Sequence, residues 1–176
     1  HKVIEDLHAD NVVTLAVDLR GHGSPAAGGV SWREFQAGDW QKLVTDAAAA
    51  IAWLRARSEV DPEHITIVGG SIGSNAAMLA FAADDRIVAG AFLSPGLPDY
   101  RGVNIEDAMP SAGSRHAFIV GSRGDSNRAQ DAETLASQAE NAEAIVLDGS
   151  AHGASQLGAN DEVRARVVGL LVTGTK

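Results

Sequence analysis

Residues 65–80 of the chain are Ile65-Thr66-Ile67-Val68-Gly69-Gly70-Ser71-Ile72-Gly73-Ser74-Asn75-Ala76-Ala77-Met78-Leu79-Ala80. The first four are apolar or β-branched and predict a buried strand, whereas the small residues after Gly73 predict a helix. Between them lies a G-x-S-x-G sequence with Ser71 at its centre. A sharp strand-to-helix turn strains the backbone of its central residue and directs that side chain away from the sheet. We therefore expect the Ser71 hydroxyl to stand at a helix N-terminus, where backbone N–H groups can stabilise an anion.

The glycines on either side of Ser71 have a predicted steric role. Gly69 and Gly73 lack the Cβ atoms that we expect to collide as strand and helix fold together. A simpler interpretation treats the motif as a glycine-rich turn in which Ser71 only caps the helix. The rest of the chain must decide, because short motifs also arise by chance.

The composition is typical of a soluble α/β protein and excludes several kinds of site. The chain has 176 residues, 45% of them hydrophobic, and a net charge of −9. No basic run is present, which argues against a nucleic-acid partner. The absence of cysteine excludes disulfides, thiolate metal sites and a cysteine nucleophile. We expect no cofactor and no metal. We also expect no membrane span, because no apolar run is long enough to cross a bilayer. The compartment, cytoplasmic or exported, is left open.

Strand-like and helix-like stretches alternate along the chain. Predicted strands cover residues 11–19, 65–68, 87–93, 117–120 and 144–147, and predicted helices cover residues 1–8, 39–57, 72–83, 129–140 and 161–172, with a short helix near 105–109. Asp39 is the expected N-cap of its helix. This alternation predicts an α/β fold with a mostly parallel sheet and helices on both faces. No repeat or linker divides residues 1–176, so we expect a single domain.

The predicted sheet restricts which polar residues can meet Ser71. In an open parallel sheet the site lies at the carboxyl ends of the strands. Among the six histidines, only His22 and His152 follow a predicted strand. Acids near strand ends are Asp18, Asp99, Asp125 and Asp148. We expect His22 to line the site or structure its loop, and Arg20 beside it to form a structural ion pair.

A serine hydroxyl needs a base within hydrogen-bond reach to act as a nucleophile at neutral pH. Histidine can accept and return that proton, and a carboxylate fixes the imidazole tautomer. Ser71, Asp125 and His152 each follow a predicted strand, in the order that accompanies a G-x-S-x-G turn in α/β-hydrolases. As alternatives, His152 is an ordinary surface-loop residue, or Asp125 caps the next helix and Asp99 replaces it.

The chain resembles the α/β-hydrolase superfamily over nearly its whole length, and most closely its compact bacterial members related to dienelactone hydrolase. The similar segments are residues 17–23, 48–54, 93–96, 121–125 and 151–153. The resemblance implies that Ser71 is the nucleophile, His152 the base and Asp125 the orienting acid. It also implies that the Ile72 N–H is one donor of an oxyanion hole, whose second donor lies upstream of the first helix. Because the sequence begins inside that helix, we expect an N-terminal segment or a second chain to supply that donor and the family's first strands.

The resemblance predicts a serine hydrolase that cleaves carboxylic esters of small molecules through an acyl-enzyme. A peptidase or thioesterase could use the same three residues, and a non-catalytic binding protein could keep the fold. The short connection between the predicted strands at 87–93 and 117–120 leaves no room for a large cap domain. We therefore expect an open cleft that favours small or flexible acyl groups. Dinucleotide-binding and P-loop folds are excluded because the glycine spacing differs and no lysine lies near the turn.

Overall fold

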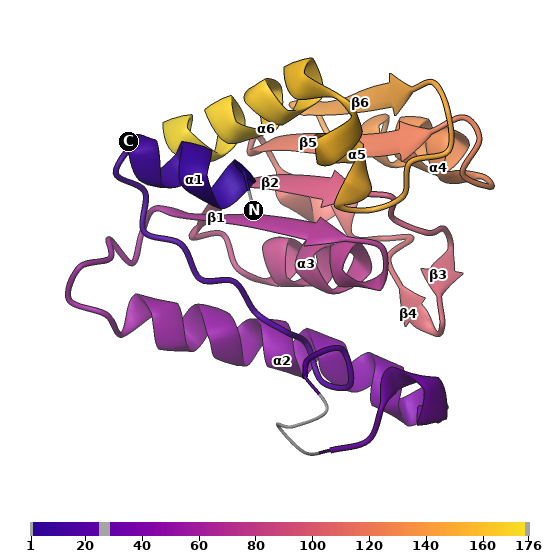
Figure 1. Cartoon of the computed structure of the whole chain (residues 1–176), viewed down its shortest axis with the longest axis horizontal. Coiled ribbons are helices and arrows are strands. Elements are labelled where there is room, and N and C mark those ends of the chain that lie inside the picture. Colours follow the sequence, from indigo (N-terminus) through magenta and orange to yellow (C-terminus); the bar gives the residue numbers. More distant parts are fainter. Residues whose placement is uncertain (1, 25–28, 175–176) are drawn as a thin grey trace.

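A four-stranded parallel sheet forms the centre of the protein (Figure 1) in a computed structural model that describes residues 2–24 and 29–174. In spatial order the strands are β1 (Ile65–Gly70), β2 (Ile87–Leu93), β5 (His116–Ser122) and β6 (Ala142–Leu147). Each neighbouring pair is parallel. The predicted α/β class and parallel sheet are therefore confirmed.

Helices cover both faces of this sheet (Figure 1). One face carries α3 (Ile72–Ala83) and α4 (Arg128–Ala136), with α2 (Ala37–Arg55) packed outside α3, and the other carries α1 (Lys2–Ala9), α5 (Ser155–Ala159) and α6 (Asp161–Thr173). Side chains alternate between the two cores along each strand. On β2, Phe92 faces α3 and α4, whereas Ala91 and Leu93 face α6.

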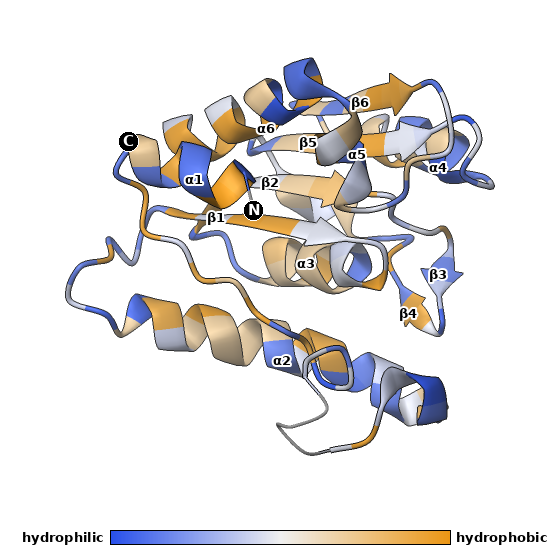
Figure 2. Cartoon of the chain, viewed as in Figure 1, coloured by the Kyte–Doolittle hydropathy of each residue, from blue (hydrophilic) through white to orange (hydrophobic). Residues whose placement is uncertain are grey.

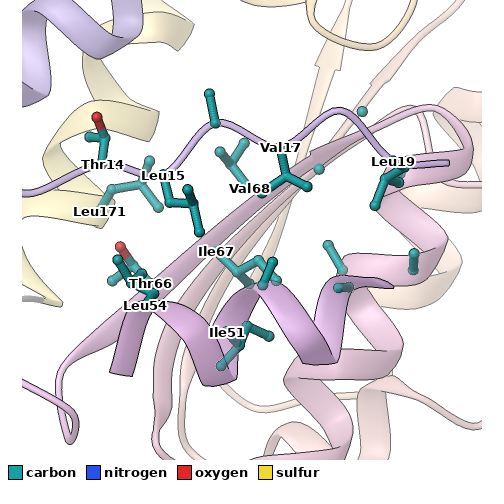
Figure 3. Close-up of a pocket in the computed structure, with 18 of the residues that line it drawn as sticks. Thr14, Leu15, Val17, Leu19, Ile51, Leu54, Thr66, Ile67, Val68 and Leu171 are labelled. Atoms are coloured by element: carbon teal, nitrogen blue, oxygen red, sulfur yellow. The ribbon is translucent and has the colours of Figure 1, made fainter. Parts of the chain in front are cut away.

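The predicted strand at residues 11–19 is wrong. These residues are largely apolar (Figure 2) and lie beside β1, but they form no ladder with it. A slot of about 460 Å³ lies between the two segments. Paired strands lie only about 4.8 Å apart, which leaves no room for such a slot. Figure 3 shows Leu15 and Val17 on one side of this slot, Val68 on the other and Ile51 of α2 nearby. Within the described residues, β1 is therefore an edge strand with an exposed apolar flank.

Several shorter features differ from the predictions. Helix α2 begins two residues earlier than expected, because Gln36 is its N-cap and Asp39 occupies the third helical position of a capping box. The short helix predicted near residues 105–109 begins later than expected, as the 3₁₀-helix η3 (Met109–Ala112). It is preceded by an unpredicted hairpin of β3 (Asp99–Tyr100) and β4 (Val103–Asn104). Another short 3₁₀-helix, η2 (Trp32–Glu34), precedes α2.

The connection from β2 to β5 contains only the β3–β4 hairpin and η3, so no large cap domain rises from it. None of the helices within residues 2–24 and 29–174 is long and apolar enough to cross a membrane.

The Arg115 guanidinium links several elements at the amino-terminal ends of the strands. It donates hydrogen bonds to the carbonyl oxygens of Phe81 at 2.7 Å and Ile87 at 3.0 Å. It also donates to the carbonyl oxygens of Asp84 and Ala112, and it lies over the Phe81 ring. The bonds to Phe81 and Asp84 satisfy carbonyl groups at the end of α3 that have no partner within the helix, and the other two reach β2 and η3.

We expect Arg115→Met to lower the free energy of unfolding by about 2–4 kcal/mol, because several carbonyl groups lose a charged donor together. Denaturant unfolding measures this loss. Arg86→Met is the matched control, since the Arg86 side chain is about half exposed and, among the described residues, bonds only to the Asp84 side chain; its cost should stay below about 1 kcal/mol. Equal losses for the two variants would contradict the prediction.

The Asp84 carboxylate makes stability at this edge dependent on pH. A hydrogen bond from the Arg55 guanidinium lowers the pKa of Asp84. The unfolded chain therefore takes up this proton at a higher pH than the folded chain, and the free energy of unfolding should fall as pH decreases from about 5 to 3. Asp84→Asn should reduce stability at pH 7 and flatten this decline. Asp85→Asn, at the exposed neighbouring position, should leave the decline unchanged in pH-dependent denaturant unfolding.

Candidate active site

Ser71 lies at the turn between β1 and α3, with its backbone in an unusual conformation. Its φ is 56° and its ψ is −130°, which L-residues with side chains rarely adopt. The Ser71 N–H donates to the Leu93 carbonyl oxygen of β2 at 2.8 Å. The strained turn expected from the G-x-S-x-G sequence is thus present, and it sets the serine at the N-terminus of α3.

The predicted steric role is confirmed for Gly69 and wrong for Gly73. A methyl group at Gly69 would lie 2.3 Å from the carbonyl oxygen of Gly73, so Gly69 is required sterically. A methyl group at Gly73 would meet only a side-chain carbon of Leu19, at 3.8 Å, so the expected collision there is wrong. At Gly70 a methyl group would lie 3.1 Å from the Ala154 nitrogen. Gly70 therefore makes room for the loop that carries His152.

Three predicted side chains form one hydrogen-bonded row. Ser71 Oγ lies 2.7 Å from His152 Nε2, and His152 Nδ1 lies 2.7 Å from Asp125 Oδ2. Because a carboxylate can only accept, Nδ1 carries the proton donated to Asp125, and Nε2 of the neutral ring is free to accept from the serine. The Asp125 side chain is 15% exposed and that of His152 is 40% exposed. The acid is thus mostly shielded from solvent, whereas the ring reaches it.

Hydrogen bonds between the loops after β5 and β6 fix the positions of Asp125 and His152 relative to each other. The Gly124 N–H donates to the Gly149 carbonyl oxygen at 2.7 Å, and the Arg123 N–H donates to Leu147 at 2.9 Å. These two bonds join the acid loop to the strand end that leads into the histidine loop. The His152 N–H in turn donates to Ser155 Oγ at 2.9 Å, which closes the loop at the start of α5.

The competing acids lie elsewhere. Asp99 accepts from the Gly102 N–H in the β3–β4 hairpin, and the highly exposed Asp148 carboxylate pairs with Arg123. The alternative in which Asp125 caps α4 is wrong, because Asn127 occupies that position.

The loop after residue 19 is built as expected, around a structural ion pair and a packed histidine. Arg20 binds Asp46 of α2 through its guanidinium and its N–H, and the hydrogen bond from Arg20 lowers the pKa of Asp46. The His22 ring stacks on Trp32 with centroids 6.0 Å apart, and Trp40 meets its edge. His22 also lines the slot beside β1.

The site contains one residue that the sequence reasoning missed. Ser94 Oγ lies 2.9 Å from Asp125 Oδ2 and accepts a hydrogen bond from the Gly153 N–H at 3.0 Å. Ser94 directly follows β2, so the restriction to carboxyl ends of strands applied to it as well. A serine at such a position is not distinguished by its residue type, as a histidine or an acid is, so the sequence does not identify Ser94. In residues 2–24 and 29–174, no cluster of three histidine or acidic side chains is arranged to hold a metal ion.

The two motif glycines should respond differently to substitution. Gly69→Ala should destabilise the protein by about 1–3 kcal/mol and displace Ser71, because the methyl group meets backbone that cannot move independently. Gly73→Ala should cost less than about 1 kcal/mol, since space is available and alanine favours a helix. Thermal or denaturant unfolding measures both. A Gly73→Ala loss as large as that of Gly69→Ala would disprove this account of the turn.

Comparisons with solved structures agree with this architecture. An esterase of Pyrococcus furiosus superposes with a TM-score of 0.75 at 21% identity, over 99% of this chain and 74% of that chain. A cold-adapted esterase from an Arctic intertidal metagenomic library has a TM-score of 0.61 at 17% identity, over 80% of this chain and 64% of its own. A thermostable carboxylesterase from a metagenomic library has a TM-score of 0.58 at 19% identity, over 76% and 64%.

At these identities the structural likeness shows the fold alone. No curated protein sequence matches the chain. The sequence profile of the Alpha/beta hydrolase family matches residues 2–129, well over half of the chain. The chain therefore belongs to the alpha/beta hydrolase family.

Proposed function

We propose that this protein is a serine hydrolase that cleaves carboxylic esters through an acyl-enzyme on Ser71. The observation that carries the proposal is the continuous row from Ser71 Oγ through His152 to Asp125, with both distances 2.7 Å. The row lies at the carboxyl ends of β1, β5 and β6, where an α/β sheet places its ligands. The simpler interpretation, a serine that only caps α3, loses support because Ser71 makes no side-chain capping bond.

In the proposed reaction, His152 Nε2 takes the proton of Ser71 Oγ as the oxygen bonds to the ester carbonyl carbon. The resulting oxyanion binds the Ile72 N–H at the N-terminus of α3. When the tetrahedral intermediate collapses, the bond to the alcohol oxygen breaks and His152 returns its proton to that leaving group. A water molecule, deprotonated by His152, then attacks the acyl-enzyme. The bond between the acyl carbon and Ser71 Oγ breaks, His152 returns the proton to Ser71 Oγ, and the carboxylic acid is released. Asp125 holds the ring in the required tautomer throughout.

Two features support the choice of small esters as substrates. Several structural neighbours are esterases or a carboxylesterase. In addition, the connection from β2 to β5 is short and His152 is 40% exposed, which leaves the site open. We also propose, more specifically, that the protein is related to dienelactone hydrolase within this family.

A fluorophosphonate probe and p-nitrophenyl acetate test the role of Ser71. Ser71→Ala should abolish labelling by the probe, and His152→Ala should slow ester hydrolysis by about 10³-fold or more, because the nucleophile loses its base. Labelling is read by intact-mass measurement and hydrolysis by release of p-nitrophenolate. A Ser71→Ala variant that is still labelled, or a wild-type protein that is never labelled, would disprove the proposal.

The matched control for His152 is His64→Ala. His64 also pairs with an aspartate, since its Nδ1 lies 2.9 Å from Asp61 Oδ2, but it precedes β1 and lies at the opposite edge of the sheet. Its removal should change the hydrolysis rate by less than about twofold, because it lies far from the reacting atoms. A comparable loss in both variants would mean that the histidine effect is structural rather than catalytic.

A further inference from the structure

Ser94 occupies a position in β2 that parallels that of Ser71 in β1. Leu93, the last residue of β2, pairs in register with Gly70 of β1, so both serines follow their strands at the same level. Ser94 has a φ of 54°, close to the 56° of Ser71, and its N–H donates to the Val120 carbonyl oxygen at 2.8 Å. Unlike Ser71, Ser94 is completely buried.

The hydrogen bonds of Ser94 determine where its single proton points. The Gly153 N–H donates to Ser94 Oγ at 3.0 Å, which occupies an acceptor position of the hydroxyl. Asp125 Oδ2 lies 2.9 Å from the same oxygen and can only accept while ionised. The Ser94 proton is therefore donated to Asp125. One carboxylate oxygen thus receives two donors, the Ser94 hydroxyl and His152 Nδ1.

We propose that Ser94 is a positioning residue of this site, an inference that rests on the proposed hydrolase function. Its hydroxyl fixes the rotation of the Asp125 carboxylate, so that Oδ2 remains aimed at His152 Nδ1. Through the Gly153 N–H it also fixes the loop that carries His152. Ser94 acts on the reaction through these two residues and does not contact Ser71 or the substrate. Its loss should therefore lower kcat while KM changes little.

Two substitutions separate the hydroxyl from the backbone strain at Ser94. Ser94→Ala removes the hydroxyl at a φ of 54°, and Ser94→Gly removes it with a residue that accepts this φ without strain. Both should lower kcat for p-nitrophenyl acetate, and the rate constant of fluorophosphonate labelling, by about 10- to 100-fold, as expected for loss of a hydrogen bond to a charged group. KM should stay within about threefold of wild type. Full activity in folded Ser94→Gly would overturn the proposal.

A double-mutant cycle tests whether Ser94 acts through Asp125. With Asp125→Asn already present, the further substitution Ser94→Ala should change the labelling rate constant by less than about threefold, because the carboxylate that it positions is gone. Ser122→Ala is the matched control. Ser122 is equally buried and its Oγ donates to the Ala151 carbonyl oxygen, so its hydroxyl supports the same loop. Ser122 meets Asp125 through the backbone, where its carbonyl oxygen accepts from the Asp125 N–H at 3.1 Å, and Ser122→Ala keeps that bond. The effects of Ser122→Ala and Asp125→Asn should multiply. Multiplicative effects of Ser94→Ala and Asp125→Asn would overturn the proposal.

The His152 Nδ1 proton provides a readout independent of turnover. Its low-field proton NMR resonance, identified by its loss in His152→Ala, should move in Ser94→Ala and stay in place in Ser122→Ala. An unmoved resonance in folded Ser94→Ala would overturn the positioning role. Ser71→Ala distinguishes this failure from failure of the proposed function. If Ser71→Ala is still labelled by the probe, both proposals are overturned. If Ser71→Ala is not labelled but the effects of Ser94→Ala and Asp125→Asn multiply, only the role of Ser94 is overturned.

Discussion

The backbone turn at Ser71 is the constraint on which the site depends. A φ of 56° costs a residue with a side chain about 1–3 kcal/mol, so the surrounding structure has to impose it. Two contacts do so: the Ser71 N–H bonds to Leu93 of β2, and Gly69 lets the first turn of α3 approach β1 closely. The register of β1 against β2 therefore determines the direction of the serine hydroxyl. The packing of β1 against β2 and the geometry of Ser71 are therefore fixed by the same contacts.

Most elements from residue 65 onward could be predicted because each is bounded by local signals. The strands are short apolar runs, and each ends in a loop containing glycine or a polar residue. Residues 11–19 have a similar apolar pattern, yet they form no strand. Such a pattern reports that a segment is extended and apolar, whereas a strand also requires a partner backbone, about which the segment itself carries no information. The β3–β4 hairpin escaped prediction because strands of two residues have no measurable periodicity.

The three predicted site residues could be chosen because the parallel sheet brings the carboxyl ends of its strands together. That rule excludes His64 and His116, which precede strands, without any knowledge of side-chain positions. The same rule cannot distinguish one serine at a strand end from another. Serine is common in loops, and its role depends on which oxygen accepts its proton. The importance of Ser94 appears only in its distances to Asp125 and Gly153.

A comparison within the molecule shows what the sheet adds to a histidine–aspartate pair. His64 and Asp61 make nearly the same contact as His152 and Asp125, 2.9 Å against 2.7 Å. However, the Asp61 side chain is 60% exposed and that of Asp125 is 15% exposed, so water screens the first carboxylate far more. Near the protein surface a carboxylate polarises an imidazole only weakly, and within residues 2–24 and 29–174 His64 makes no hydrogen bond to a serine. Only the His152–Asp125 pair, of these two, also has a hydroxyl beside the second ring nitrogen and a carboxylate that is mostly shielded from solvent. The topology of the sheet meets both conditions at one edge alone.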